Sequence, residues 1–190
     1  MSGNLGGARL TPEVSGRDHA EGDAAAPVTL VEYGDYECPH CGHAHPIVKS
    51  IQHRLGRKLR FVFRNFPLGE AHPHARHAAE AAEAAADQGR FWQMHDAIFE
   101  NQTQLADEEL VATARRLRID AERIARALEE GTYTARVRED FRSGIRSGVN
   151  GTPTFFINGE RYDGAWADED SFVRALERAA KEGVAGGAAR

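Results

Sequence analysis

The sequence predicts an α/β fold with the element order βαβ, then a helical block, then ββα. Short runs of apolar and β-branched residues, typical of buried strands, occur at 28–33, 59–64 and 153–157. Between the second and third runs the chain is rich in alanine, glutamate and arginine, which favour helices. A helical segment separates the first two runs, and this β–α–β order favours a parallel pair of strands.

The first helix is expected between Cys38 and Gly56, because apolar residues recur at helical spacing there: Ile47, Val48, Ile51 and Leu55. Gly56 is a typical helix end. In the helical block, the composition of 75–88 indicates a strong helix, and Asp107 and Asp120 are expected to cap two later ones. Two further helices are expected around Phe91–Phe99 and Val137–Ile145.

The last part of the chain returns to strand signals. Asn158-Gly159 follows the run at 153–157 directly and is a strong hairpin turn, so a return strand is expected from Arg161. Asp168 is expected to cap a final helix that ends at Gly183.

These elements divide the chain into four parts. We expect a flexible N-terminal extension over 1–26, because it is rich in glycine and poor in large apolar groups. The main domain is expected over 27–66 and 148–183, a helical insertion over 67–147, and a frayed tail over 184–190.

Composition restricts the function class. The chain has 190 residues, 41% of them hydrophobic, which suits one soluble domain with its own core. Its 24 basic and 29 acidic residues give a net charge of −5, so neither nucleic acid nor an anionic membrane is expected as a partner. No secretory signal is recognisable at the start, and a cytoplasmic location is therefore expected.

The two cysteines are separated by two residues, in Cys38-Pro39-His40-Cys41. Positions i and i+3 of a helix lie on one face, at a separation that suits a disulfide. Cys38 is expected at a helix N-terminus, where free N–H groups and the helix dipole favour a thiolate. Pro39 suits the first turn, and His40 can add positive charge beside the sulfur. The motif therefore predicts a redox-active pair.

The two thiols are expected to have different roles. Cys38 is the more exposed one and is predicted to form a mixed disulfide, which Cys41 then resolves. Because the two sulfurs store the electrons themselves, we expect neither a bound cofactor nor a metal. The alternative is a zinc-binding module in which Cys38 and Cys41 act with nearby histidines, His40, His43 and His45. A closed zinc site usually needs a second ligand pair far away in the chain, and no second cysteine pair exists.

A second group of histidines, at positions 72, 74 and 77, is close in sequence. Metal binding is the alternative here as well. We interpret these residues as capping and solvating the start of the following helix.

The segment VTLVEYGDYECPHC, at 28–41, resembles the DsbA-like branch of the thioredoxin superfamily. The segment GTPTFFING, at 151–159, resembles the cis-proline loop and following strand of that branch. The resemblance covers about residues 27–182, and the chain looks most like bacterial DsbA family proteins that lack a signal peptide. It implies a thioredoxin-like fold with an inserted helical domain, and a thiol–disulfide oxidoreductase acting on protein or small-molecule disulfides.

The resemblance also implies roles for residues outside the motif. Thr152-Pro153 is implied to be a cis peptide that packs against the cysteines and holds the substrate backbone. Glu32 is implied to be a buried acid that moves protons to and from the inner cysteine, which a raised pKa would allow. The alternative for Glu32 is a strand-end residue that reaches solvent or pairs with Arg64.

Two aspects of function stay open at this stage. The motif does not fix the direction of electron flow, which depends on the reduction potential of the pair and of its compartment. Related folds also host glutathione-dependent isomerases or transferases, which usually carry one serine or cysteine where this chain has a pair. The oligomeric state is not predicted.

Overall fold

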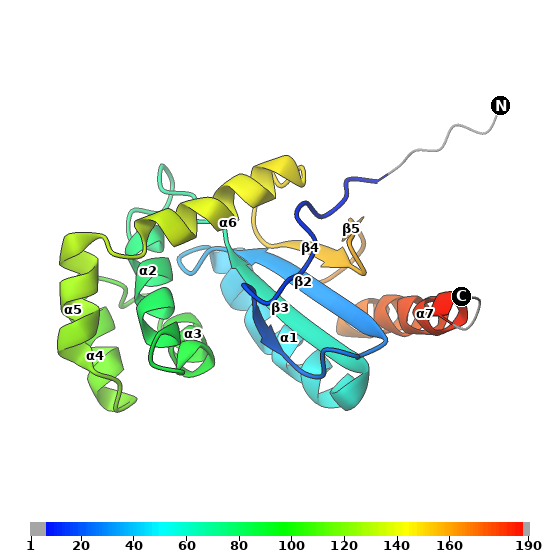
Figure 1. Cartoon of the computed structure of the whole chain (residues 1–190), viewed down its shortest axis with the longest axis horizontal. Helices are drawn as coiled ribbons and strands as arrows, with labels where there is room; N and C mark the ends of the chain where they lie inside the picture. The colour runs from blue at the N-terminus through cyan, green and yellow to red at the C-terminus, as the bar shows by residue number, and fades with distance from the viewer. Residues whose placement is uncertain (1–6, 188–190) are drawn as a thin grey trace.

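The computed structural model describes residues 7–187 and contains a five-stranded sheet with the strand order β1-β3-β2-β4-β5 (Figure 1). The central strands β2 and β3 are parallel, and the other neighbours pair antiparallel. The predicted α/β fold, βαβ followed later by ββα, is therefore confirmed. The strands are β1 His19–Glu21, β2 Val28–Gly34, β3 Leu59–Asn65, β4 Thr154–Ile157 and β5 Glu160–Tyr162.

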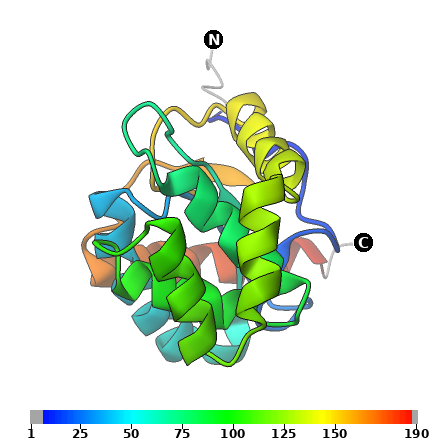
Figure 2. The ribbon, with the colours of Figure 1, turned by 90° about the vertical axis from the view of Figure 1, so that its left-hand side faces the viewer.

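Five helices lie in the interval between β3 and β4, where the insertion was predicted. Of these, α2 to α5 form a lobe beside the sheet (Figure 1), and this lobe faces the viewer in Figure 2. In residues 7–187, no helix combines the length and the apolar character that crossing a membrane requires. The helices are α1 Pro39–Leu55, α2 Ala75–Ala86, α3 Phe91–Glu100, α4 Asp107–Arg116, α5 Ala121–Glu130, α6 Thr134–Arg146 and α7 Glu169–Gly187, with a short 3-10 turn at Gly56–Lys58.

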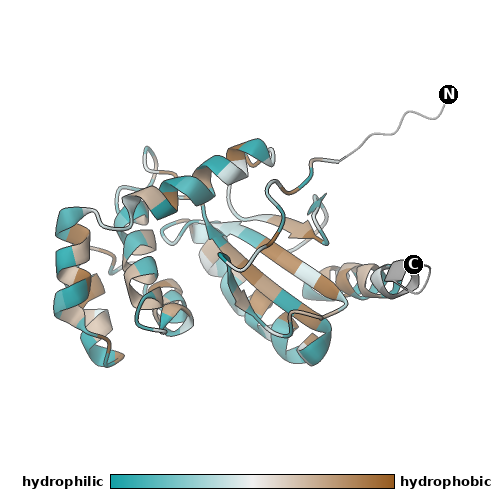
Figure 3. Cartoon of the chain, viewed as in Figure 1, coloured by the Kyte–Doolittle hydropathy of each residue, from teal (hydrophilic) through white to brown (hydrophobic). Residues whose placement is uncertain are grey.

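The central strands β2 and β3 are each buried at six of seven positions, and most of their residues are apolar (Figure 3), as expected for a sheet covered on both faces. Alternate residues of a strand point to opposite faces. Val31 and Tyr33 belong to a cluster that packs against Phe141 of α6 and the N-terminal segment. Leu30 belongs to the larger cluster under α1 and α7. Glu32 is on the same face as Leu30, the face that α1 covers.

The predicted flexible extension over 1–26 is wrong for residues 7–26. Leu10 is buried, and its backbone N–H donates to the Gly159 carbonyl. Farther on, β1 adds an antiparallel edge strand to β3. This strand has only three residues, two of them polar, so it leaves no periodic signal in the sequence. Residues 1–6 of the predicted extension lie outside the described part of the chain.

The final helix continues past its predicted end. Gly183 lies inside α7, which extends to Gly187. A Cβ atom at position 183 would approach the Pro27 carbonyl oxygen to 2.9 Å. Gly183 therefore permits close packing of α7 against the start of β2. The predicted tail at 184–190 is helical as far as Gly187, and residues 188–190 lie outside the described part.

A buried ion pair fastens the N-terminal segment to the sheet. The Arg64 guanidinium donates to Asp18 at 2.7 Å, and also to the Pro12 carbonyl and the Tyr33 hydroxyl. Arg64 and Asp18 are almost fully buried. Burial raises the pKa of Asp18, but hydrogen bonding and the charge of Arg64 outweigh it and hold the pKa below its usual value.

Replacing Asp18 by asparagine should lower the free energy of unfolding by about 3 kcal/mol, because it leaves the Arg64 charge buried without its partner. The difference from the native chain should shrink as the pH falls below about 4, since a depressed pKa contributes stability only while the carboxylate is ionised. Urea denaturation at several pH values measures both effects. Glu122→Gln, which removes an exposed ion pair with Arg115, is the control and should change stability little.

Candidate active site

Cys38 lies where the chain passes from the sheet into the first helix. Strand β2 ends at Gly34, a short turn follows, and Cys38 is the N-cap of α1 with extended backbone angles, φ −71° and ψ 123°. Pro39 opens the helix, where its missing N–H breaks no hydrogen bond. The first turn therefore presents its free backbone N–H groups at the sulfur of Cys38.

The surroundings of Cys38 favour its thiolate. A hydrogen bond from the Cys41 thiol is the largest influence, and it lowers the pKa of Cys38 against the opposing effect of burial. Hydrogen bonding from the Thr152 side chain and from the backbone N–H groups of Cys41 and His40 lowers it further, to about 5. Cys38 is thus ionised and nucleophilic at neutral pH.

Cys41 has the opposite character. It is fully buried, and burial raises its pKa well above the usual value. The hydrogen bond that it gives to Cys38 and the nearby Glu32 raise it further, although the Asp35 backbone N–H donates to its sulfur at 3.4 Å. Both cysteines are free thiols in this structure. The pair therefore combines an ionised outer sulfur with a protonated inner one.

Pro39 and His40 form the exposed rim of the motif. The backbone N–H of His40 acts on the Cys38 thiolate, as described above. The additional charge predicted for the His40 imidazole stays a prediction.

The predicted cis-proline loop lies against the outer cysteine. The Thr152–Pro153 peptide bond is cis, and the Cys38 thiol donates to the Thr152 carbonyl oxygen at 3.4 Å. The buried Thr152 hydroxyl has no hydrogen-bond partner in the described structure while Cys38 is a thiol that donates to this carbonyl. It is the group that donates to Cys38 once the thiol is ionised, which is the hydrogen bond from the Thr152 side chain described above.

Glu32 is buried in the centre of the sheet, where its neighbours across the strands are Phe63 and Phe155. The alternative pairing with Arg64 is not formed, since Arg64 donates to Asp18, and Glu32 Oε1 has no hydrogen-bond partner among the described residues. Burial, together with the negative charge of Cys38, raises the pKa of Glu32 to about 8. The charge of the Cys38 sulfur therefore influences the Glu32 carboxyl group. The ionisation of Glu32 can change near neutral pH.

Asp35 organises the turn between β2 and α1, a role that the sequence analysis did not assign. Its buried carboxylate accepts hydrogen bonds from the backbone N–H groups of Glu37 and Leu68, both at 2.8 Å, and bonds to His72 Nδ1 at 2.7 Å. Its own N–H donates to Cys41. An aspartate just before the motif is a typical turn residue, but its long-range partners are visible only in three dimensions.

Gln102 connects the helical lobe to the motif and was also missed. Its side-chain amide donates to the carbonyl oxygens of Tyr36 and Cys38, at 2.8 and 2.9 Å. A Cβ atom on Gly42 would lie 1.9 Å from the Gln102 side-chain oxygen. The absence of a side chain at Gly42 is therefore what lets Gln102 reach the first turn of α1.

The structure separates the other histidine candidates. His72 bonds to Asp35 and His77 to Asp107, so these histidines hold different carboxylates. Within residues 7–187, one group of three or more side chains is arranged as potential metal ligands, and it contains neither Cys38 nor Cys41. The arrangement gives the zinc alternative at the two cysteines no support.

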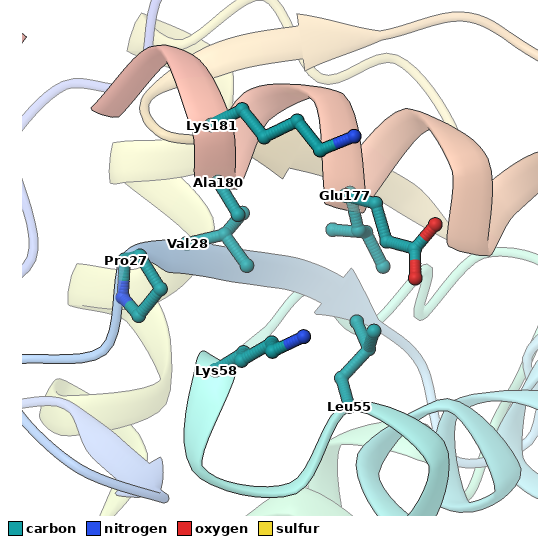
Figure 4. Close-up of a pocket in the computed structure, with 8 residues that line it drawn as sticks. Pro27, Val28, Leu55, Lys58, Glu177, Ala180 and Lys181 are labelled. Carbon is teal, nitrogen blue, oxygen red and sulfur yellow. The ribbon is translucent and has the colours of Figure 1, made fainter. Parts of the chain in front are cut away.

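A hollow with a mainly apolar lining lies away from the cysteines (Figure 4). It has a volume of about 420 Å³ between the start of β2, the end of α1 and α7, and is lined by Pro27, Val28, Leu55, Lys58, Leu176, Glu177, Ala180 and Lys181. The cysteine motif follows the opposite, carboxyl end of β2. Cys38, which is itself only 4% exposed beneath the rim of Pro39 and His40, therefore lies away from this hollow.

A protein-family model described as Thioredoxin matches residues 14–178 of this chain. The chain belongs to the thioredoxin family. It is 42% identical over 177 residues to a Na⁺/H⁺ antiporter NhaA 1 of Salinispora arenicola, a match that covers 93% of this chain and 26% of that protein. A Na⁺/H⁺ antiporter NhaA of Herminiimonas arsenicoxydans is 39% identical over 92% of this chain and 27% of its own length. The chain thus spans about a quarter of these relatives.

Among solved structures, the chain is similar to DsbA-like proteins of the thioredoxin superfamily. Oxidised BdbD from Bacillus subtilis matches with a TM-score of 0.83 at 26% identity, over 93% of this chain and 99% of that one. A thioredoxin-like oxidoreductase from Silicibacter pomeroyi matches with a TM-score of 0.76 at 28% identity, over 88% and 94%. The α-DsbA1 of Wolbachia pipientis shares the fold at a TM-score of 0.77 and 18% identity, over 91% and 96%.

Alkylation of Cys38 should follow an apparent pKa of about 5, because the rate depends on the thiolate. Replacing Cys41 by alanine should raise this pKa towards the usual value, since it removes the hydrogen bond that lowers it most. The rate of iodoacetamide labelling against pH, read by mass, tests both statements. An unchanged pKa in Cys41→Ala would show that Thr152 and the backbone N–H groups activate Cys38 without the Cys41 thiol.

Proposed function

We propose that this chain is a dithiol–disulfide oxidoreductase in which Cys38 and Cys41 exchange electrons with protein or small-molecule disulfides. One observation carries the proposal: the two sulfurs are hydrogen-bonded to each other, yet one has its pKa lowered to about 5 and the other has it raised. A pair of this kind has an ionised nucleophile in Cys38, directly beside the exposed Pro39 and His40, and a protonated second thiol in Cys41.

The reaction follows from these two states. The Cys38 thiolate attacks one sulfur of a substrate disulfide, forms a mixed disulfide, and releases the other substrate sulfur as a thiolate. Cys41 then loses its proton and attacks the Cys38 sulfur, which frees the second substrate thiolate and leaves a Cys38–Cys41 disulfide. Two electrons pass to the substrate, and the same steps in reverse oxidise a dithiol substrate.

Glu32 is proposed to take the proton from Cys41 during the second step. The charge of the Cys38 thiolate is one of the two causes that raise the Glu32 pKa. Formation of the mixed disulfide removes that charge, so the Glu32 pKa falls and the carboxylate becomes more populated at neutral pH. Glu32 can therefore act as a base at the step in which Cys41 loses its proton.

Thr152 and Pro153 are proposed to hold the substrate. The carbonyl of Thr152 contacts Cys38, and Pro153 lacks an N–H and follows on the surface next to it. An extended substrate segment laid along this loop would bring its disulfide to the outer sulfur.

The proposed direction of electron flow depends on the redox state of the compartment in which the chain acts. The stabilised Cys38 thiolate favours the dithiol form, which makes the disulfide form oxidising. We place the chain in the cytoplasm, because both of its cysteines belong to the reactive pair and neither serves as a structural staple. A glutathione-rich cytoplasm would hold the pair mostly reduced. Rapid acid trapping of cells followed by alkylation reads this state directly.

Equilibration of the purified chain with mixtures of reduced and oxidised glutathione should show reversible formation of a Cys38–Cys41 disulfide, read as a mass change after alkylation. Cys41→Ser should accumulate mixed disulfides through Cys38, because the resolving thiol is absent, and Cys38→Ser should accumulate none. Failure of the native pair to close would refute the proposal. A glutathione-dependent isomerase or transferase needs one thiol, so activity that survives in Cys41→Ser would favour that alternative.

Replacing Glu32 by glutamine should slow the resolution of a preformed mixed disulfide by about 10²-fold, the usual contribution of a general base. In the native chain the rate should rise with pH and level off below pH 8, because loss of the Cys38 charge lowers the Glu32 pKa from about 8. In the variant the rate should keep rising with pH, because Cys41, whose pKa is raised, must ionise without a base. Rapid mixing at a series of pH values measures it, with Glu122→Gln as a surface control.

Stability measurements separate this effect from misfolding. A carboxyl group whose pKa is raised on folding makes the folded state less stable as the pH rises from the unfolded-state pKa to the folded-state pKa of that group. Glu32→Gln should therefore unfold at higher urea concentration than the native chain near pH 8. A variant that is both slower and less stable at this pH would contradict the role given to Glu32.

A further inference from the structure

A second cluster of ionisable groups lies between α1 and α3, behind the cysteine motif. His45 of α1 and the neighbours His95 and Asp96 of α3 each offer one possible ligand atom, and the three atoms lie within 4.8 Å of one another. His45 Nε2 is 3.6 Å from Asp96 Oδ1. None of these residues takes part in the redox chemistry proposed above.

Both imidazoles are held in the interior, since His45 is 9% and His95 2% exposed. The centres of the two rings are 5.5 Å apart. Imidazole nitrogen is a common ligand of transition-metal ions, so two buried rings beside one carboxylate are positioned to share an ion.

Asp96 contains an unsatisfied buried oxygen. Its Oδ2 accepts a hydrogen bond from the Lys49 ammonium at 3.0 Å, but Oδ1, which faces His45, is buried without a hydrogen-bond partner in the described structure. A buried carboxylate oxygen without a partner is unfavourable, so native structures usually supply one, such as a donor, a water or an ion.

The surroundings of the two histidines fix their rings. The Tyr36 hydroxyl hydrogen-bonds to His95 Nδ1 at 2.9 Å, which leaves Nε2 of that ring for a ligand. Phe99 stacks on His45 with the ring centres 5.0 Å apart. Hydrogen bonding of the second ring nitrogen is the usual way in which proteins orient a metal-binding histidine.

We propose that His45, His95 and Asp96 bind a divalent transition metal of the zinc class, with a fourth position left for water. Two imidazoles and one carboxylate are a common three-residue ligand set for such ions. Metal–ligand distances of about 2.0–2.2 Å require ligand atoms roughly 3.4 Å apart. The His45–Asp96 pair, at 3.6 Å, is close to this separation, and the His95 atom lies within 4.8 Å of both.

The Lys49 ammonium is the competing cation. It holds Asp96 Oδ2 and is also 3.8 Å from Glu21, to which it can turn when a metal arrives. Because His45 follows Cys41 by one helical turn, a bound metal would tie α1 to α3 directly behind the redox pair. The proposal departs from the sequence-based expectation that the chain binds no metal.

Zinc titration by calorimetry tests the site in a full-length Cys38→Ser/Cys41→Ser chain, in which thiolates cannot bind the ion. One Zn²⁺ per chain is expected. His45→Ala and Asp96→Asn should each weaken binding at least tenfold, whereas His53→Ala, which removes an exposed histidine from the same helix, should leave it unchanged. Lys49→Gln should tighten binding, because it removes the competing charge.

A thermal melt covers the case in which one variant folds poorly. Added Zn²⁺ should raise the melting temperature of the parent and of His53→Ala, but not that of Asp96→Asn, since only a site formed in the native state stabilises it. Absence of zinc binding by the parent would overturn the proposal. So would binding that survives both His45→Ala and Asp96→Asn, or binding that weakens in Lys49→Gln.

Discussion

Cys38 and Cys41 are only one helical turn apart, yet the first turn of α1 gives the two sulfurs different electrostatic environments. Cys38, at the cap, faces free backbone N–H groups, whereas Cys41 is packed into the apolar face of the helix. Ionisation is therefore favoured at one sulfur and opposed at the other, although the two are hydrogen-bonded. The remaining features of the site act by keeping this turn fixed at the edge of the sheet.

Three separate parts of the chain fix it. Asp35 holds the preceding turn and binds the loop after β3 through Leu68 and His72. Thr152, just before β4, closes over the outer sulfur. Gln102, just after α3, supports the first turn from the helical lobe. Each of these contacts joins segments far apart in sequence, so the reactivity of Cys38 depends on the assembled fold and not on the motif alone.

Sequence reasoning predicted what local pattern controls. The order of strands and helices, the position of Cys38 at a helix start and the strand containing Glu32 all follow from short-range periodicity and helix-end chemistry. It failed where tertiary packing overrides local composition. Residues 7–26 of the glycine-rich segment are ordered by the Arg64–Asp18 pair and by pairing of β1. Asp35 and Gln102 could not be assigned to the site, because their partners are dozens of residues away.

The close approach of Gln102 to Gly42 couples the substitutions that these two positions can accept. Because a side chain at 42 and the amide at 102 would occupy the same space, neither position can vary freely while the other stays as it is. Substitutions in descendants of this chain should therefore occur at both positions together. A larger residue at 42 should accompany a shorter one at 102, together with some other donor for the carbonyl of Cys38. The helical lobe and the redox motif are in this sense inherited as one unit.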